Sequence, residues 1–202
     1  MSFKKLVPEV VEALALVGIV EIPTPCKPMF SAMKSGGHLF ALAPKGSGKT
    51  DTAIVAAFNR VNRQHEGAPR VLFICCSIDE AIRVHQRMSI VAKHLDVTVD
   101  LAHDKGNQVL QRNNIFDGTE IIVGTIKRIF DLYVQNGINV QLLDYLIFDD
   151  FELLLTQGKI MEIHRLTEGV NKTQVVCLAN QNKVRIEQFF ERSPLKFKLL
   201  ES

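Results

Sequence analysis

A glycine-rich run near the start of the chain combines a flexible backbone with a cation and a hydroxyl. It consists of Ala43, Pro44, Lys45, Gly46, Ser47, Gly48, Lys49 and Thr50. Glycines let successive backbone N–H groups turn toward one point, and the start of a helix adds positive potential there. This is the chemistry of a phosphate-binding loop, in which Lys49 reaches the β- and γ-phosphates of a nucleotide and the Thr50 hydroxyl binds Mg²⁺.

The strict pattern of such loops begins with glycine, where this chain has Ala43. The alternative interpretation is a glycine-rich turn that caps an ordinary helix. The run lies between a predicted strand, His38–Ala43, and a predicted helix, Gly48–Arg63, and a phosphate-binding loop requires this context. We therefore favour phosphate binding.

A pair of acids, Asp149 and Asp150, follows another apolar segment. The metal of a phosphate-binding loop needs an acidic partner at a strand end, so we predict that Thr50 and Asp149 hold Mg²⁺. Asp150 is then placed to orient and deprotonate an attacking water, and the candidate catalytic residues are Lys49, Asp149 and Asp150. Alternatively, the acids cap the following helix Phe151–Thr156, because Asp and Glu are favoured in first turns.

Short apolar segments alternate with amphipathic ones along the chain. The predicted strands are His38–Ala43, Val71–Cys76, Val97–Leu101, Glu120–Gly124, Tyr145–Asp149, Gln174–Leu178 and Lys196–Leu200. The predicted helices between them are Gly48–Arg63, Ile78–His94, Asn107–Phe116, Ile126–Val134, Lys159–Thr167 and Asn182–Glu191. Nearly continuous apolar strands are typical of a sheet covered on both faces. This pattern predicts a three-layer α/β domain with a mostly parallel central sheet and helices on both sides.

The prolines at positions 23, 25 and 28 separate a first predicted helix, Lys5–Val17, from the rest of the chain. We therefore expect a helical segment over residues 1–35, followed by one compact domain over residues 36–202.

Composition excludes several classes of protein. The 202 residues are 47% hydrophobic and carry a net charge of +2, which argues against a disordered chain and against a strongly basic, histone-like binder. No apolar run reaches the ~18–20 residues of a membrane span. The four cysteines form no CxxC pair, and we expect them to be buried free thiols in a reducing cytoplasm.

The phosphate loop and the acidic pair, in this order, resemble the first RecA-like domain of a DEAD-box RNA helicase. In that family an isolated aromatic residue and a Pro-Thr-x-x-Gln segment hold the adenine, and Phe3 and Ile22–Lys27 stand in those places. The family's loop itself begins with alanine, so Ala43 fits it. The resemblance implies ATP and Mg²⁺ as cofactors, with Phe3, Pro23, Thr24 and Lys27 at the adenine.

Further segments extend the resemblance over nearly the whole chain. The family's two RNA-contacting loops correspond to residues 76–81 and 125–128, and its Ser-Ala-Thr segment to residues 178–180. The implied RNA contacts, to the sugar-phosphate backbone without sequence readout, are Ser77, Thr125, Lys127 and Arg128. The implied coupling residues are Ala179 and Asn180. An alternative for Lys127 and Arg128 is a solvated first turn of the following helix.

Departures from the family bear on activity. Lys27 replaces the glutamine that both donates to and accepts from adenine, and a lysine only donates. Asp150 is one methylene shorter than the family's glutamate, and misplacement by ~1 Å can cost about a hundredfold in rate. Ile78 and Leu178 lack the arginine and the hydroxyl found there in the family. His103–Gly106 stands where the family has a Gly-Gly loop.

In that family a second RecA-like domain supplies arginine fingers, each type worth on the order of 10³–10⁵ in rate. Because the chain ends where the first domain would end, we expect it to bind nucleotide, hydrolyse it slowly and need such a domain, in cis or in trans, for unwinding. Two alternatives stay open. One is a degenerate helicase-like module that binds nucleotide without significant ATPase activity, and the other is an unrelated P-loop ATPase.

Overall fold

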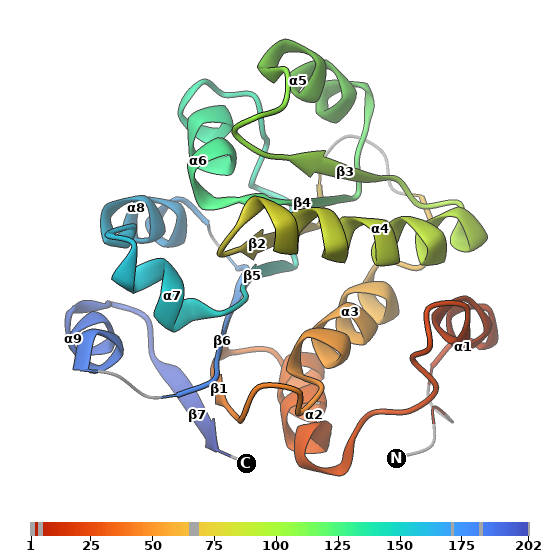
Figure 1. Ribbon diagram of the computed structural model, residues 1–202, viewed down its shortest axis with the longest axis horizontal. Helices are drawn as coiled ribbons and strands as arrows, with labels where there is room; N and C mark the ends of the chain where they lie inside the picture. The colour runs from red at the N-terminus through yellow and green to blue at the C-terminus, as the bar shows by residue number, and fades with distance from the viewer. Residues whose placement is uncertain (1–2, 4–5, 65–68, 171, 182–183, 202) are drawn as a thin grey trace.

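One parallel sheet organises the chain in the computed structural model, which describes residues 3, 6–64, 69–170, 172–181 and 184–201 (Figure 1). Its seven strands lie in the order β3-β4-β2-β5-β6-β1-β7, and every pair of neighbours is parallel. The strands are β1 His38–Leu42, β2 Val71–Cys75, β3 Val99–Ala102, β4 Ile121–Thr125, β5 Tyr145–Phe148, β6 Gln174–Ala179 and β7 Phe197–Glu201. The three-layer α/β fold predicted from the sequence is confirmed.

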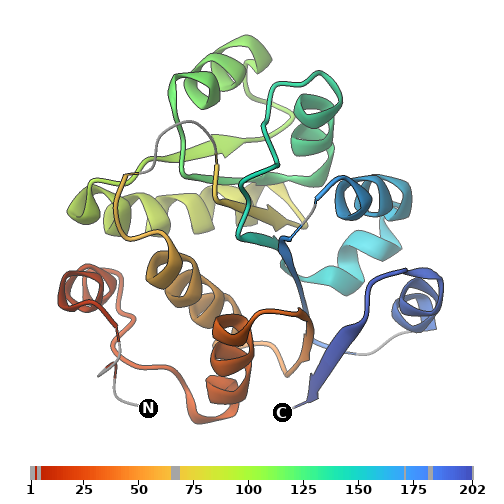
Figure 2. The same cartoon turned by 180° about the vertical axis from the view of Figure 1, so that it is seen from behind.

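Helices cover both faces of the sheet, as the views from the front and from behind show (Figures 1 and 2). They are α1 Pro8–Ala15, the 3₁₀ helix η1 Thr24–Cys26, α2 Lys27–Ser35, α3 Lys49–Arg60, α4 Ile78–Leu95, α5 Gln108–Asp117, α6 Ile126–Val134, α7 Phe151–Thr156, α8 Ile160–Gly169 and α9 Val184–Arg192. The first of the two hydrophobic cores joins α1–α4 to one face, and the second joins α5–α9 to the other. Strands such as β2 and β4 are buried along their whole length because both their faces are covered.

The sequence prediction misses α2. The proline at position 28 indicated a break, but it stands in the first turn of α2, where a backbone N–H has no intrahelical acceptor and its loss costs nothing. The first helix, α1, is shorter than predicted and begins at Pro8 for the same reason. Both helices pack into the core that also holds α3 and α4. The division of the chain between residues 35 and 36 stays a prediction.

Because all strands are parallel, their carboxyl ends meet at one edge of the sheet. The residues that follow β1, β6, β5, β2, β4 and β3 are, in that order across the sheet, the glycine-rich loop, Asn180, Asp149, Cys76, Ile126 and His103. Ligands of parallel α/β sheets bind outside the carboxyl ends of the strands. The fold therefore gathers nearly all candidate site residues at this edge.

Candidate functional site

The glycine-rich loop leaves β1 and ends where α3 begins at Lys49. Gly46 and Gly48 have backbone φ angles of +83° and +93°, in the left-handed region that favours glycine. A Cβ atom on Gly48 would also lie 2.7 Å from Cγ of Pro23. Gly48 is therefore required both by its conformation and by the close approach of residue 23.

Lys49 is buried, with 5% of its surface exposed, and its ammonium is held by acceptors of the protein. Nζ donates to the carbonyl oxygens of Ala43 (2.5 Å) and Pro44 (3.0 Å) and to Oδ1 of Asn180 (3.0 Å). Burial lowers the pKa of Lys49, and the charges of Asp149 and Asp150 oppose this effect. A phosphate bound at this ammonium would have to replace the loop carbonyls as its acceptors.

Thr50 and Asp149 meet as the sequence predicted. The Thr50 hydroxyl donates to Oδ2 of Asp149 at 2.8 Å and so joins the start of α3 to the end of β5. Asp149 is 7% exposed; burial, followed by the charge of Asp150, raises its pKa from 3.8 to about 6, although the Thr50 hydrogen bond lowers it.

The oxygens of Thr50 and Asp149 fit Mg²⁺, which takes oxygen ligands and is usually bound by one or two protein groups plus phosphates and waters. Within the described residues, no group of three or more His, Cys, Asp or Glu side chains gathers as a metal site. A metal at Thr50 and Asp149 therefore needs the remaining ligands from a nucleotide and from water.

Asn180, which follows β6, links Asp150 and Glu152 to the loop. Its Nδ2 donates to Oδ1 of Asp150 (2.6 Å) and to Oε1 of Glu152 (2.9 Å), while its Oδ1 accepts from Lys49. Its backbone N–H also donates to Oε1 of Glu152 (3.2 Å). Ala179, the other predicted coupling residue, is buried in β6, and its carbonyl oxygen accepts from the N–H of Ala43 (3.1 Å).

Asp150 has a second neighbour that sequence reasoning treated as an inert thiol. Sγ of Cys76, at the end of β2, donates to Oδ2 of Asp150 at 3.7 Å. Burial, followed by the charge of Asp150, raises the pKa of Cys76 to about 12, so the thiol stays protonated. Asp150 itself has a φ of +50°, and aspartate is one of the residue types that tolerate this left-handed conformation. The position of Cys76 after an apolar strand could have signalled this contact.

The predicted adenine segment lies against the loop. Pro23 abuts Gly48, and Sγ of Cys26 donates to the carbonyl oxygen of Ser47 at 3.2 Å. Lys27 donates to Oγ1 of Thr24 at 3.1 Å.

The other residues predicted at the nucleotide also have defined places. Phe3 is partly buried against the core of α1–α4, and Lys45 is exposed. Pro44 and Asn180 line a hollow of about 450 Å³ at this edge of the sheet.

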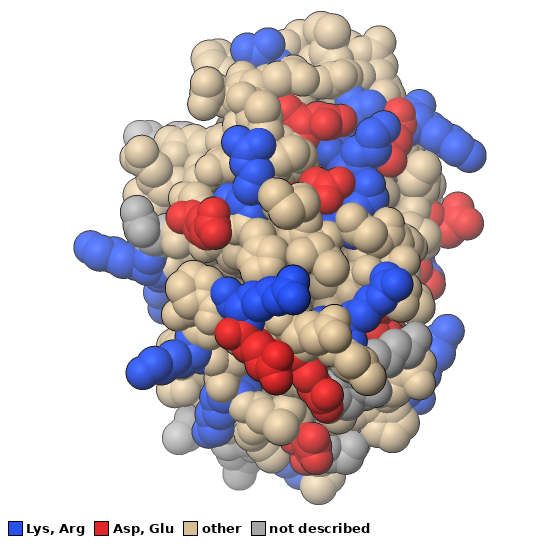
Figure 3. Space-filling view, turned by 90° about the vertical axis from the view of Figure 1, so that its left-hand side faces the viewer, with Lys and Arg blue, Asp and Glu red and all other residues tan. Residues whose placement is uncertain are grey.

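The residues predicted to contact RNA differ in exposure. Ser77 caps α4, where its hydroxyl accepts from the N–H of Glu80 at 3.2 Å. Thr125 is buried and donates to Asp104. Arg128 is also buried, and of these four side chains Lys127 presents an exposed charge. Figure 3 shows the side of the molecule that lies to the left in Figure 1, where positive and negative side chains are interspersed.

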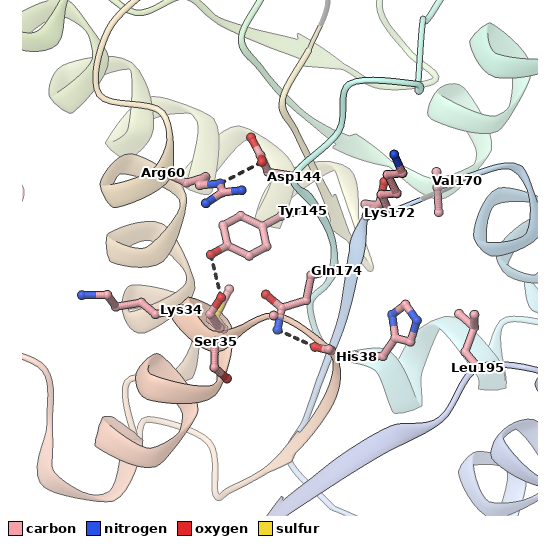
Figure 4. A pocket seen from close by; sticks show the side chains of 14 residues that line it. Lys34, Ser35, His38, Arg60, Asp144, Tyr145, Val170, Lys172, Gln174 and Leu195 are labelled. Atoms are coloured by element: carbon pink, nitrogen blue, oxygen red, sulfur yellow. Dashed lines mark hydrogen bonds and ion pairs between the residues drawn. The ribbon is translucent and has the colours of Figure 1, made fainter.

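A hollow of about 590 Å³ lies at the opposite, amino edge of the sheet (Figure 4). Nε of Arg60 donates to Oδ1 of Asp144 at 2.8 Å. The Tyr145 hydroxyl donates to the carbonyl oxygen of Met33 at 2.9 Å. Nε2 of Gln174 donates to the carbonyl oxygen of Gly37 at 2.5 Å. These bonds tie α2 and α3 to β5 and β6. The polar groups here are structural, and the carboxyl edge is the candidate site.

A family model of DEAD/DEAH box helicases matches residues 27–182. The chain belongs to this family. The ATP-dependent RNA helicase RhlB of Shewanella sp. (strain ANA-3) is 28% identical over 167 residues, which are 79% of this chain and 38% of that protein. The ATP-dependent RNA helicase eIF4A of Eremothecium gossypii is 27% identical over 145 residues, 71% of this chain and 36% of that protein. The chain thus spans well under half the length of these DEAD-box relatives.

Solved structures show the same fold. A DEAD box protein from the hyperthermophile Methanococcus jannaschii superposes with a TM-score of 0.85 at 17% identity, over 98% of this chain and 54% of that one. The resemblance to the N-terminal, RecA-like domain of DEAD-box helicases, first seen in the motifs, is confirmed. No helix among the described residues is both long and apolar enough to cross a membrane.

Proposed function

We propose that this chain is the ATP- and RNA-binding domain of a DEAD-box-type ATP-dependent RNA helicase. It binds Mg-ATP at the glycine-rich loop and the backbone of single-stranded RNA at loops along the same sheet edge. The observation that carries the proposal is the 2.8 Å contact between Thr50 and Asp149, which are far apart in sequence and are the two groups that a P-loop enzyme uses at its metal.

Each side chain has a definite task in this proposal. Lys49 exchanges its carbonyl acceptors for the β- and γ-phosphates and offsets their charge. Thr50 and Asp149 would hold Mg²⁺, which would supply positive charge to offset that of the phosphates. Asp150 orients the attacking water and accepts its proton, and Asn180 fixes the Asp150 carboxylate from the neighbouring strand.

Efficient turnover also needs groups that these residues do not include. A second RecA-like domain, in cis or in trans, supplies the arginine fingers that stabilise the transition state, at about 10³–10⁵ in rate. We therefore propose weak hydrolysis by this domain alone and no unwinding. We also propose a cytoplasmic protein, because all four cysteines are free thiols.

A second candidate function is a nucleotide-binding interaction module without significant ATPase activity. It is favoured by the surroundings of Asp150, whose carboxylate is short and already accepts from Asn180 and Cys76. A general base engaged in this way has to exchange a hydrogen bond before it can approach a water.

Titration of ATP with and without Mg²⁺, followed by steady-state hydrolysis with and without single-stranded RNA, separates these functions. Stimulation of hydrolysis by RNA, greatest when a second RecA-like domain is added, supports the helicase domain. Tight binding with no turnover under any condition supports the interaction module. Brisk turnover that ignores RNA contradicts both and indicates a P-loop ATPase of another kind. Lys49→Ala is the matched control, since it should weaken ATP binding in every case.

A further inference from the structure

The strand β7 forms one edge of the sheet and pairs, among the described residues, with β1 alone. Figures 1 and 2 show no helix or strand beyond it in the plane of the sheet. The part of the chain that the structure describes makes no backbone hydrogen bond to its outer side. An edge strand of this kind presents a row of N–H and C=O groups that can pair with another extended chain.

An apolar hollow lies against one face of β7. The register with β1 pairs Phe40 with Leu199, so both side chains lie on the face of the sheet that carries α9. Leu199 is 51% exposed, although it is a large apolar side chain. The hollow measures about 620 Å³ and is lined mainly by Phe40, Ile186, Phe190, Leu195, Phe197 and Leu199.

Aromatic rings form the floor of this hollow. The ring centroid of Phe190, on α9, lies 4.7 Å from that of Phe197 and 4.8 Å from that of Phe40. The Phe197 ring also lies 5.6 Å from the ring of His38 on β1. Packing of the rings against one another holds them in place, so an apolar side chain of a partner would enter a preformed hollow.

The two faces of β7 carry opposite charges. Lys198 pairs with Leu39, so it lies on the face that carries α1–α4, and its side chain is exposed. Glu201 pairs with Leu42 on the face of the hollow and is exposed as well. An acidic side chain on a docked strand is therefore attracted beside Lys198 and repelled beside Glu201. Because side chains alternate along a strand, this pattern favours a segment with apolar residues toward the hollow and acidic residues between them.

A second copy of this chain does not supply such a segment. If β7 paired antiparallel with its own copy across a twofold axis, each residue would face one on the same side of the combined sheet. Lys198 would then face Lys198 or Leu200 of the copy, and never Glu201, which lies on the other face. Lysine on an edge strand opposes self-pairing for this reason. The charges therefore favour a partner of another sequence.

We propose that the outer edge of β7 binds an extended segment of a partner protein in which apolar and acidic residues alternate. The segment adds a further strand to the sheet through main-chain hydrogen bonds, while its apolar side chains fill the hollow and its acidic ones lie beside Lys198. This inference does not depend on nucleotide or RNA binding, so it stands or falls separately from the proposed function.

Fluorescence anisotropy with synthetic peptides tests the proposal. The probe is a labelled peptide of about seven residues, enough to span β7, in which leucine alternates with glutamate. It should bind about tenfold or more tightly than a peptide in which leucine alternates with lysine. N-methylation of the alternate amides that face β7 should weaken binding by about tenfold, because main-chain donors are lost, whereas methylation of the other set should not. No binding by the glutamate peptide, or equal binding by the glutamate and lysine peptides, would overturn the proposal.

A charge reversal locates the binding site. Lys198→Glu should bind the lysine peptide more tightly than the glutamate peptide, and Leu199→Ser should weaken binding of the glutamate peptide. Both side chains are exposed, so these variants should keep the fold. Lys93→Glu, which reverses an exposed charge in the last turn of α4, is the matched control and should keep the wild-type preference. An unchanged preference in Lys198→Glu would refute binding at β7.

Hydrogen exchange and sedimentation velocity distinguish the possible occupants. The glutamate peptide should slow exchange of the β7 amides and leave that of the α4 amides unchanged, whereas slowing confined to other elements contradicts the proposal. Without peptide the chain should sediment as a monomer. A dimer that Leu199→Asp dissociates would show that a second copy occupies this edge, and the proposed partner segment would then be wrong.

Discussion

Replacing Asp149 with asparagine should stabilise the nucleotide-free protein while removing its metal site. Asp149 is almost fully buried, and burial with the adjacent Asp150 charge raises its pKa to about 6. At neutral pH the native state therefore carries a buried carboxylate that is less stable than the same group in the unfolded chain. Asparagine removes that charge and keeps an oxygen that can accept from the Thr50 hydroxyl.

The size of this effect follows from the pKa. A rise from 3.8 to about 6, at about 1.4 kcal/mol for each pH unit, corresponds to about 3 kcal/mol. This net shift already includes the attraction between Asp149 and Lys49, so we expect a gain of about 1–3 kcal/mol in the free energy of unfolding at pH 7.5. For a chain of this length the melting temperature should rise by about 2–12 °C.

The pH dependence identifies the cause. Because the native pKa lies above the unfolded value, the native state holds more protons between about pH 4 and pH 6, and wild-type stability falls as the pH rises through this range. Urea unfolding of wild type and Asp149→Asn at pH 4 and at pH 7.5 should show the advantage of the variant only at the higher pH. A variant that is less stable at pH 7.5, or equally favoured at both values, would refute the reasoning. Calorimetry should show that Asp149→Asn has lost the Mg²⁺-dependent part of ATP binding.

Four further substitutions test the loop and the catalytic acid. Lys49→Ala should weaken ATP binding about 10- to 100-fold, as expected for lost charged hydrogen bonds, with little change in melting temperature without nucleotide; calorimetric titration checks this, and unchanged affinity would contradict it. Asp150→Glu should raise RNA-stimulated hydrolysis by about 10- to 100-fold in the presence of a second RecA-like domain if the short side chain limits the rate; equal turnover would show that it does not. Gly48→Ala should destabilise the fold by about 2–4 kcal/mol, because the added methyl group would meet Pro23. Gly46→Ala should cost about 1 kcal/mol, because residue 46 has a similar positive φ angle but open space around it. Equal losses in urea unfolding would contradict this explanation.

The fold was predictable because the strands are short, apolar and buried on both faces. Every predicted strand overlaps an observed one, and the parallel order follows once helices alternate with strands. The sequence determines the first and last residues of each helix and strand less strongly than it determines which helices and strands are present. Proline at position 28 carries two opposite meanings, helix break or first helical turn, and local pattern alone does not choose between them.

The arrangement of the candidate site residues was predictable where a motif fixes both residue type and spacing, as in the contact of Thr50 with Asp149. It was less predictable where burial decides the role. Arg128 and Lys127 are adjacent cations in the sequence, yet one is buried and the other exposed because α6 turns one face to the core and the next residue to solvent. The contact of Cys76 with Asp150 depends on the order of the strands, which brings β2 beside β5.

The strand order also explains how one edge could serve two ligands. Side-chain contacts join neighbouring strand ends from Cys76 to Asp150, from Asp150 to Asn180 and from Asn180 to Lys49. A separate group joins Asp104, Thr125 and Arg128 at β3 and β4. Between these groups the described residues show no side-chain hydrogen bond, and the backbone pairing of Cys75 with Thr125 connects them. Any influence of RNA on the nucleotide site within this domain would therefore act through movement of β2 against β4, and not through a continuous chain of polar side chains.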